Sequence, residues 1–140
     1  MKANLPYYIW LISHHLYLRK VPVIPFLLTQ CMRVILSCFI PYEVKIGKNA
    51  HFGHLGLGIV LHRDAVIGDN VRIDQHVTIG GRVGEGAPII GNNVRIGAGA
   101  KVLGGISIGD NVQIGANAVV LINVPNNSTA VGVPAKVLHK

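Results

Sequence analysis

The sequence predicts an all-β fold in which most of the chain winds into a parallel β-helix of hexapeptide repeats, behind a short α-helical N-terminal segment. Branched apolar residues recur every six positions, and glycine or a polar residue usually follows each of them. A fixed internal period of this kind is typical of parallel β-helices. The repeating positions are Leu61, Ile67, Ile73, Ile79, Ile90, Ile96, Val102, Ile108, Ile114 and Val120.

The period of six separates the β-helix from its alternatives. Amphipathic helices need apolar spacings of three and four, and hairpin proteins need short turn signals between longer alternating strands. Six is even, so strand residues six apart point to the same side. Three hexads make a coil that returns over itself, so we expect like residues to stack about 4.8 Å apart. The expected pairs are Ile90 with Ile108, Ile96 with Ile114, and Val102 with Val120.

The composition is that of one folded domain of 140 residues, with 50% apolar and only 14% charged residues. This balance argues against disorder. The net charge of +7 indicates attraction to anions, such as a phosphorylated cofactor, a membrane surface or a nucleic acid. The basic residues are scattered and carry no stacking aromatics among them, so we expect no nucleic-acid partner.

The two cysteines predict free thiols. Cys31 and Cys38 are seven residues apart, which on a helix separates them by about 10.5 Å along the axis. That distance is too long for a disulfide. We expect two buried free thiols, as suits a cytoplasmic protein.

The first 40 residues differ from the rest of the chain. Two runs rich in large apolar residues, Leu5 to Leu18 and Phe26 to Ile40, predict two helices separated by the prolines of the segment 21–25. The first run lacks the basic region and small-residue cleavage site of a signal peptide. The expected organisation is a helical segment over 1–40, a β-helix domain over 41–125 and a C-terminal tail over 126–140.

Two interpretations of the helical segment stay open. Neither run reaches the length of a membrane span, and Arg33 interrupts the second. The helices can pack against the β-helix or against a sister subunit. They can also lie on a membrane surface, helped by Arg19, Lys20 and Arg33.

The period fails at two places. The step from Phe52 to Leu61 is nine positions instead of six, which marks an irregular corner at 54–58. The step from Ile79 to Ile90 is eleven positions, so a loop within 81–88 leaves the coil. Irregular loops on a rigid scaffold are where function is usually placed.

The candidate chemistry lies with the histidines, because motifs for nucleotide loops, zinc fingers and nucleophile elbows are missing and no metal site is expected. A histidine can accept a proton near neutral pH. His54 stands out in the glycine-flanked corner, and His62 follows at its far end. His51 and His76 fall at regular coil positions, which favours structural roles. The others are His14, His15 and His139.

The repeats carry motifs that resemble the hexapeptide-repeat acetyltransferases, and most closely the serine O-acetyltransferase branch with its relatives from surface-polysaccharide clusters. The resemblance covers residues from about 40 to 138. It rests on the Gly-His corner at 53–54, the run VTIGG before the loop, the run IGAGAK, and the closing VGVPAK.

The resemblance implies a left-handed parallel β-helix, a homotrimer, and acetyl-CoA as co-substrate between neighbouring subunits. The family's catalytic histidine falls on His54, which would take the proton from an acceptor hydroxyl during direct acetyl transfer. The cofactor-binding positions fall on Gly81, Ala98, Ala116 and Lys136. Lys101 and Lys136 are candidates to meet CoA phosphates as point charges.

The chain departs from the serine enzymes on the acceptor side. Phe39 stands where those enzymes carry the aspartate that orients the histidine, Gly53 replaces a second aspartate, and Ala87 replaces a second histidine. Glu43 is a candidate substitute for the orienting group. The acceptor is therefore expected to be L-serine or a sugar hydroxyl, and a non-catalytic β-helix binding protein is the third alternative.

Overall fold

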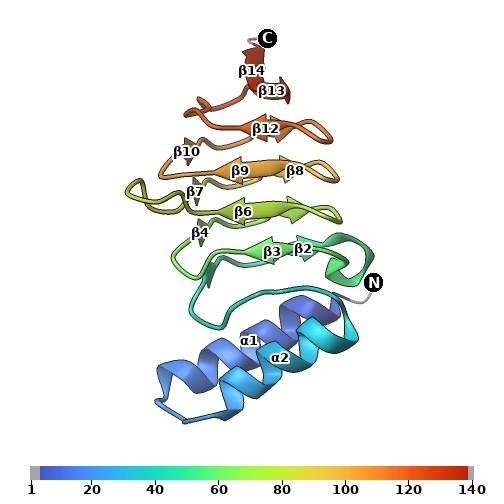
Figure 1. Ribbon diagram of the computed structural model, residues 1–140, viewed down its shortest axis with the longest axis vertical. Helices are drawn as coiled ribbons and strands as arrows, with labels where there is room; N and C mark the ends of the chain where they lie inside the picture. The colour runs from blue at the N-terminus through green and yellow to red at the C-terminus, as the bar shows by residue number, and fades with distance from the viewer. Residues whose placement is uncertain (1–3, 139–140) are drawn as a thin grey trace.

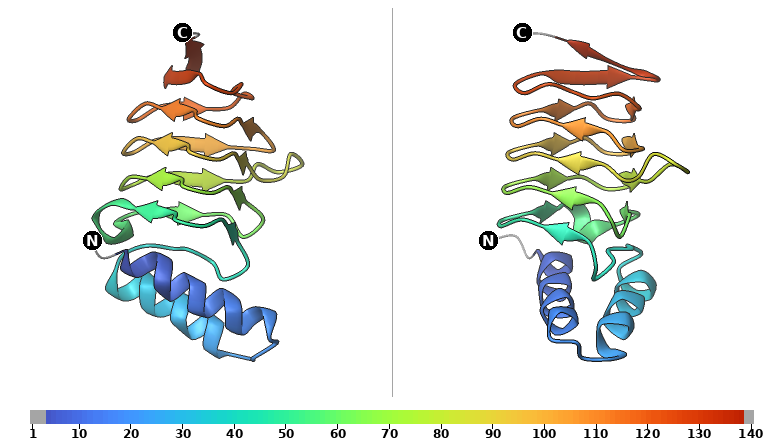
Figure 2. Two further views of the ribbon diagram at one scale, coloured as in Figure 1. Left: turned by 180° about the vertical axis from the view of Figure 1, so that it is seen from behind. Right: turned by 90° about the vertical axis from the view of Figure 1, so that its left-hand side faces the viewer.

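Two helices lie beneath a three-sided parallel β-helix in the computed structural model, which describes residues 4–138 (Figure 1). Helices α1 (Leu5–Leu18) and α2 (Ile24–Ile35) form a hairpin at one end of the molecule. The coils of the β-helix stack upward from this hairpin to the C-terminal strands (Figure 2). His139 lies outside the described residues.

Short strands make up the three faces of the β-helix. The first sheet holds β1 (Lys45–Ile46), β4 (Val66–Ile67), β7 (Ile89–Ile90) and β10 (Ser107–Ile108). The second holds β2 (His51–Phe52), β5 (Arg72–Ile73), β8 (Arg95–Ile96), β11 (Gln113–Ile114), β13 (Thr129–Gly132) and β14 (Ala135–Leu138). The third holds β3 (Val60–Leu61), β6 (Thr78–Gly80), β9 (Lys101–Leu103) and β12 (Val119–Val120). All pairs are parallel except β13 with β14.

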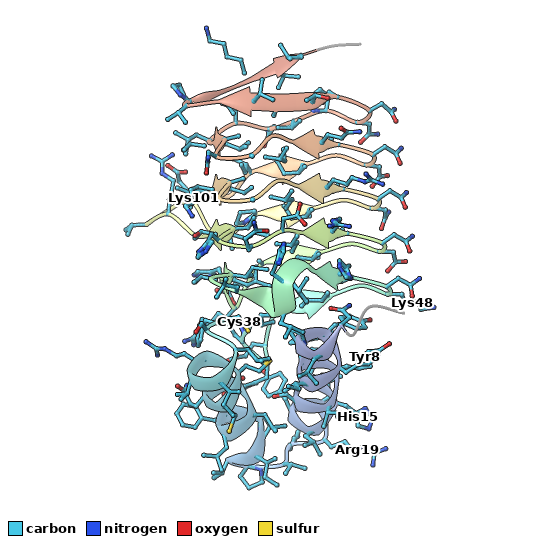
Figure 3. All side chains as sticks on the ribbon, turned by 90° about the vertical axis from the view of Figure 1, so that its right-hand side faces the viewer. Tyr8, His15, Arg19, Cys38, Lys48 and Lys101 are labelled. Atoms are coloured by element: carbon cyan, nitrogen blue, oxygen red, sulfur yellow. The ribbon has the colours of Figure 1, made fainter. Side chains whose placement is uncertain are left out.

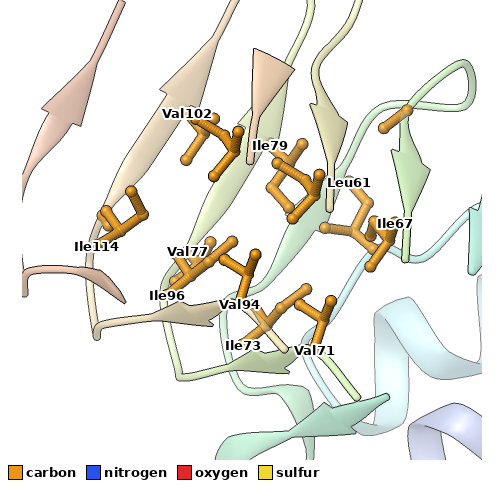
Figure 4. Packing of buried hydrophobic residues seen from close by; sticks show 14 of the residues in the cluster. Leu61, Ile67, Val71, Ile73, Val77, Ile79, Val94, Ile96, Val102 and Ile114 are labelled. Carbon is orange, nitrogen blue, oxygen red and sulfur yellow. The ribbon is translucent and has the colours of Figure 1, made fainter. Parts of the chain in front are cut away.

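Stacked branched side chains fill the interior (Figure 4). The register confirms the three predicted stacks: Ile90 with Ile108, Ile96 with Ile114, and Val102 with Val120. These side chains are almost fully buried. Burial of one such side chain contributes about 1.5–3 kcal/mol, so the repeated columns stabilise the scaffold.

One corner, between the first and second sheets, is closed by a ladder of asparagine side chains. These residues have φ between 56° and 58°, a left-handed conformation that asparagine tolerates. Four hydrogen bonds link the five residues, in which the side-chain amide of one asparagine donates to the side-chain carbonyl oxygen of the next at 2.9–3.2 Å. The ladder consists of Asn49, Asn70, Asn93, Asn111 and Asn127. Sequence reasoning missed it, although the Ile-Gly-x-Asn pattern that begins four of its five layers was visible.

A second ladder runs beside the first. The side-chain oxygens of Asp69, Asn92, Asp110 and Asn126 accept hydrogen bonds from the backbone N–H of the coil below, at 2.6–2.8 Å. These bonds satisfy corner N–H groups that a turn would otherwise leave unpaired. This corner is therefore built for stacking in every coil.

Helix α1 is fixed to the first coil by side chains. The Asn4 carboxamide contacts the carbonyl oxygen of Ala50 and accepts from the Phe52 N–H at 3.3 Å. The Tyr7 hydroxyl donates to the carbonyl oxygen of Gly47 at 3.1 Å. His14 Nδ1 lies 2.7 Å from the carbonyl oxygen of Tyr42. The hairpin is thus a tied part of the fold.

Two expectations for the helical segment were wrong. Helix α2 begins at Ile24, because Pro25 suits the first helical turn, and ends at Ile35. The following residues extend along the β-helix, where Phe39 pairs with Val60. Cys31 is exposed rather than buried, while Cys38 is buried as expected. No helix between residues 4 and 138 is long and apolar enough to cross a membrane.

Removing one rung of the ladder should destabilise the protein measurably. We expect Asn93→Gly to lower the free energy of unfolding by about 1 kcal/mol, because two side-chain hydrogen bonds disappear while the left-handed backbone is kept. Asn117→Gly is the matched control, since Asn117 has the same φ outside the ladder. Urea unfolding at one protein concentration measures both. Equal losses in the two variants would contradict a stabilising ladder.

The two thiols should differ in reactivity. Burial raises the pKa of the Cys38 thiol to about 11, so it stays protonated and unreactive at neutral pH. We expect a maleimide to label one thiol per folded chain, none in Cys31→Ser, and a second thiol only after unfolding. Mass spectrometry of the labelled protein checks this, and labelling of Cys38 in the folded protein would contradict it.

Candidate active site

His54 lies on an open, left-handed corner between the second and third sheets. The corner contains the 3-10 turn η1 (Gly53–Gly56), in which His54 has φ 49° and Leu55 has φ 56°. The Gly58 N–H donates to the carbonyl oxygen of Ser37 at 2.8 Å and anchors the end of the corner. The His54 side chain is exposed. The expected irregular corner is therefore present, and it presents an imidazole to solvent.

The coil above brings a carboxylate to the same corner. A Cβ atom at Gly53 would lie 2.9 Å from Asp74 Oδ1, so the space beside Gly53 is occupied by Asp74. Arg72 Nε donates to Asp74 Oδ1 at 3.0 Å. Asp74 was not identified from the sequence. The strand register could have indicated it: β2 pairs with β5, so Gly53 and Asp74, which follow these two strands, stack on each other.

His76 also lies above this corner. Its backbone N–H donates to the carbonyl oxygen of Leu57 at 2.8 Å, and its φ is 59°. A Cβ atom at Gly58 would lie 2.1 Å from His76 Nδ1, so this close approach requires glycine at position 58. His76 occupies a regular corner position, as expected, but it stacks directly on the His54 corner.

Small residues continue this edge upward. Ala98 and Ala116 lie on the same corner in higher coils, where the Asn117 N–H donates to the carbonyl oxygen of Ala98 at 2.8 Å. Strand spacing places these coils roughly 10 and 14 Å above the His54 level. Lys101 Nζ donates to the carbonyl oxygen of His76 at 2.7 Å, so its ammonium lies on this edge (labelled in Figure 3). Ala98, Ala116 and Lys101 are thus brought into line with His54.

The edge is narrow because the coils stack so closely that glycine is required at several positions. A Cβ atom at Gly97 would lie 2.6 Å from the backbone N of Ala116, and one at Gly99 would lie 2.1 Å from Asn117 Oδ1. In the two upper coils the apolar side chains at this edge are the methyl groups of Ala98 and Ala116, whereas Leu55 and Leu57 are exposed at the level of His54. A narrow edge with a lysine beside it fits a thin, flexible arm such as the pantetheine of CoA.

The other two expected cofactor residues, Gly81 and Lys136, differ in position. Gly81 follows β6 at the next corner, where its Cβ position is 3.1 Å from His62 Nε2. Lys136 lies on β14 at the top of the molecule and is exposed. A single chain therefore does not bring Gly81 to the His54 edge. Lys136 pairs with Val131, and Val131 Cγ1 lies 2.7 Å from the Cβ position of Gly115, so Lys136 lies above Gly115 at the upper end of this edge.

The loop within 81–88 projects from the β-helix (Figure 2). Arg82 Nη1 lies 3.3 Å from Glu85 Oε2, and the loop folds over Gly105, where a Cβ atom would lie 1.7 Å from the Glu85 carbonyl oxygen. Val83 at its tip is fully exposed. The loop is therefore braced at its base and free at its tip.

A pocket of about 470 Å³ lies between α2 and the third sheet. Phe39 and Glu43 line it together with His62 and Arg63, whereas His54 does not. Phe39, which stands at the position of the missing aspartate, and Glu43, the candidate substitute, therefore face this pocket. Its full lining is Phe26, Thr29, Gln30, Phe39, Pro41, Tyr42, Glu43, Val60, Leu61, His62, Arg63, Thr78, Ile79 and Gly80.

The part of the chain that the structure describes contains no assembled metal site. No group of three or more histidine, cysteine, aspartate or glutamate side chains there is placed to hold an ion. Chemistry at the corner rests on His54, with Asp74 and His76 above it.

Comparison with known proteins agrees with this geometry. Residues 87–121 match the model of the bacterial transferase hexapeptide family (six repeats). A serine acetyltransferase of Synechococcus elongatus is 42% identical over 132 residues, which cover 92% of this chain and 54% of that protein. The chain thus spans about half the length of this relative.

Solved structures agree as well. Soybean serine acetyltransferase complexed with serine has a TM-score of 0.89 and 39% identity, covering 96% of this chain and 56% of that one. A serine acetyltransferase in complex with CoA has a TM-score of 0.88 and 38% identity, covering 95% and 55%. The likeness confirms the left-handed β-helix. By sequence and by fold, the chain is similar to the hexapeptide-repeat acetyltransferases, and in particular to the serine acetyltransferases.

Proposed function

We propose that this protein is an acetyl-CoA-dependent O-acetyltransferase whose acceptor is L-serine. The observation that carries the proposal is the exposed His54 at the foot of an edge of small residues. A base lies there beside a track for a thin cofactor arm. The relatives that bind serine and CoA support the choice of both substrates.

In this mechanism His54 is the general base. Its neutral imidazole accepts the proton of the acceptor hydroxyl while the hydroxyl oxygen attacks the thioester carbonyl. The bond from that carbonyl carbon to sulfur breaks, and the imidazolium returns the proton to the departing thiolate. The acetyl group passes directly to the acceptor, and no covalent bond to the protein forms.

The proposed CoA track uses Ala98, Ala116 and Lys101 on the His54 edge. Lys136 lies at the upper end of the same edge. Gly81 lies at another corner, so it reaches CoA only when a neighbouring subunit supplies one wall of the groove. This arrangement favours the homotrimer that the family resemblance implies. Lys101 and Lys136 would meet CoA phosphates as point charges.

Asp74 is proposed as the positioning residue for His54. It places a carboxylate where Gly53 has no side chain, and Arg72 holds that carboxylate at 3.0 Å. A carboxylate that orients a catalytic histidine can contribute orders of magnitude to rate. Neither Phe39 nor Gly53 offers a carboxylate to orient His54. In this proposal Asp74, from the next coil, takes that role.

A sugar hydroxyl is the second candidate acceptor. The apolar side chain of Phe39 and the methyl of Ala87 replace two polar groups of the serine enzymes, and these changes alter the acceptor side. The free thiols support a reducing compartment such as the cytoplasm. Both acceptors are compatible with that location.

Loss of His54 should abolish most of the activity. We expect His54→Asn, which tolerates the left-handed backbone, to lower kcat with L-serine by about 100-fold or more. Thiol release from acetyl-CoA measures the rate, and a panel of sugars tests the second acceptor. His15→Asn on α1 is the control. Full activity in His54→Asn would contradict the assigned base, and tight acetyl-CoA binding without turnover on any acceptor would favour a non-catalytic binding protein.

Loss of the Asp74 charge should affect turnover more than binding. We expect Asp74→Asn to lower kcat by about tenfold or more while the KM for acetyl-CoA stays near its original value. Asp69→Asn is the matched control, because asparagine already fills this ladder position in the coils of Asn92 and Asn126. A loss shared by both variants, or a lowered Tm in Asp74→Asn, would indicate a structural role instead.

A further inference from the structure

The outer surface of the helical hairpin is unusually apolar. Val34, Ile35 and Leu18 expose 80%, 75% and 64% of their surface. Single exposed apolar residues are normal, but a gathered set on one element marks an interaction surface. We call this set the hairpin face; it comprises Leu5, Tyr8, Leu11, Ile12, Leu18, Val23, Ile24, Leu27, Val34 and Ile35.

The hairpin does not need these residues for its own packing. The buried residues of the hairpin, which we call the seam, are Pro6, Trp10 and Ser13 on α1, and Pro25, Thr29 and Met32 on α2. Ser13 Oγ donates to the carbonyl oxygen of Pro25 at 3.0 Å. Figure 3 shows Tyr8, His15 and Arg19 pointing away from this seam. The hairpin face therefore remains free after folding of the chain.

The charge of the hairpin has one sign. Residues 4–42 include no aspartate or glutamate, although the chain carries six such residues elsewhere. Arg19, Lys20 and Arg33 are exposed on the hairpin. A partner for this surface must accept apolar side chains and also provide negative charge.

A second copy of the hairpin does not meet both conditions. Its face would bring apolar residues but only positive charges, and like charges at close range repel. An anionic lipid bilayer provides acyl chains together with phosphate groups. Each lysine or arginine close to such a surface contributes about 1 kcal/mol to the free energy of binding.

We propose that the hairpin face binds peripherally to an anionic lipid bilayer. Helix α1 has 14 residues, about 21 Å, so it lies in the interface rather than across the membrane. The hairpin hangs below the β-helix, opposite the C-terminal strands (Figure 1). Docking would place the first coil, with His54, nearest the lipid surface. The inference does not depend on the proposed acetyl transfer.

Vesicle binding of the full chain tests the proposal. A polarity-sensitive fluorophore on Cys31 reports from α2, one turn from Leu27 and Ile35. We expect a blue shift and co-sedimentation with vesicles containing about one third phosphatidylglycerol, and little of either with pure phosphatidylcholine. Salt at about 0.5 M should weaken the binding.

Two variants and one control locate the surface. We expect Val34→Asp with Ile35→Asp to weaken the partition by about tenfold or more, and Arg19→Gln with Lys20→Gln to weaken it for anionic vesicles. Val83→Asp is the control, since this exposed valine lies on the loop at 81–88. Circular dichroism melting shows that the variants fold.

Three results would overturn the proposal. The first is no binding of the wild-type chain to anionic vesicles. The second is equal weakening by the Val83→Asp control. The third is concentration-dependent self-association without lipid that Val34→Asp with Ile35→Asp abolishes, because it assigns the hairpin face to a second copy.

Discussion

The stacking of coils at strand spacing is the constraint on which the rest of the structure depends. No coil buries its inner face alone, so each needs the next in register, about 4.8 Å away. The backbone is packed so closely that a Cβ atom at Gly68 would lie 2.6 Å from the carbonyl oxygen of Gly91. Extra residues cannot enter such a stack. They leave it at a corner, and the corners therefore carry the features that differ between coils.

One corner of the β-helix contributes to stability and another carries the candidate chemistry. The corner between the first and second sheets repeats asparagine in every coil and gives its polar groups to the two ladders. The corner between the second and third sheets has no such ladder. It holds His54 in the first coil, His76 in the second and alanines above. A vertical edge of that kind can present a base and a cofactor track in line, because successive coils place successive groups at fixed heights.

The period of six predicted the register, the inward columns and both breaks, because all of them follow from spacing along the chain. Asp74 was not predicted, because its place beside Gly53 follows from register between coils and from the missing Cβ of that glycine. Ile35 ends α2 because the chain must turn there to pair Phe39 with Val60, a long-range contact that local propensity does not contain. The exposure of Cys31 depends on which face α2 packs against α1, and both faces are apolar.

The hairpin also forms the floor of the His54 corner. A Cβ atom at Gly56 would lie 3.3 Å from Cys38 Sγ and 3.3 Å from Pro6 Cγ, so this glycine packs between the two segments. Pro6 belongs to α1, and Cys38 follows α2. Asp74 closes the same corner from above. The position of His54 is therefore set by contacts with the hairpin below and with the second coil above. A movement of the hairpin would displace this corner, because their atoms are in contact.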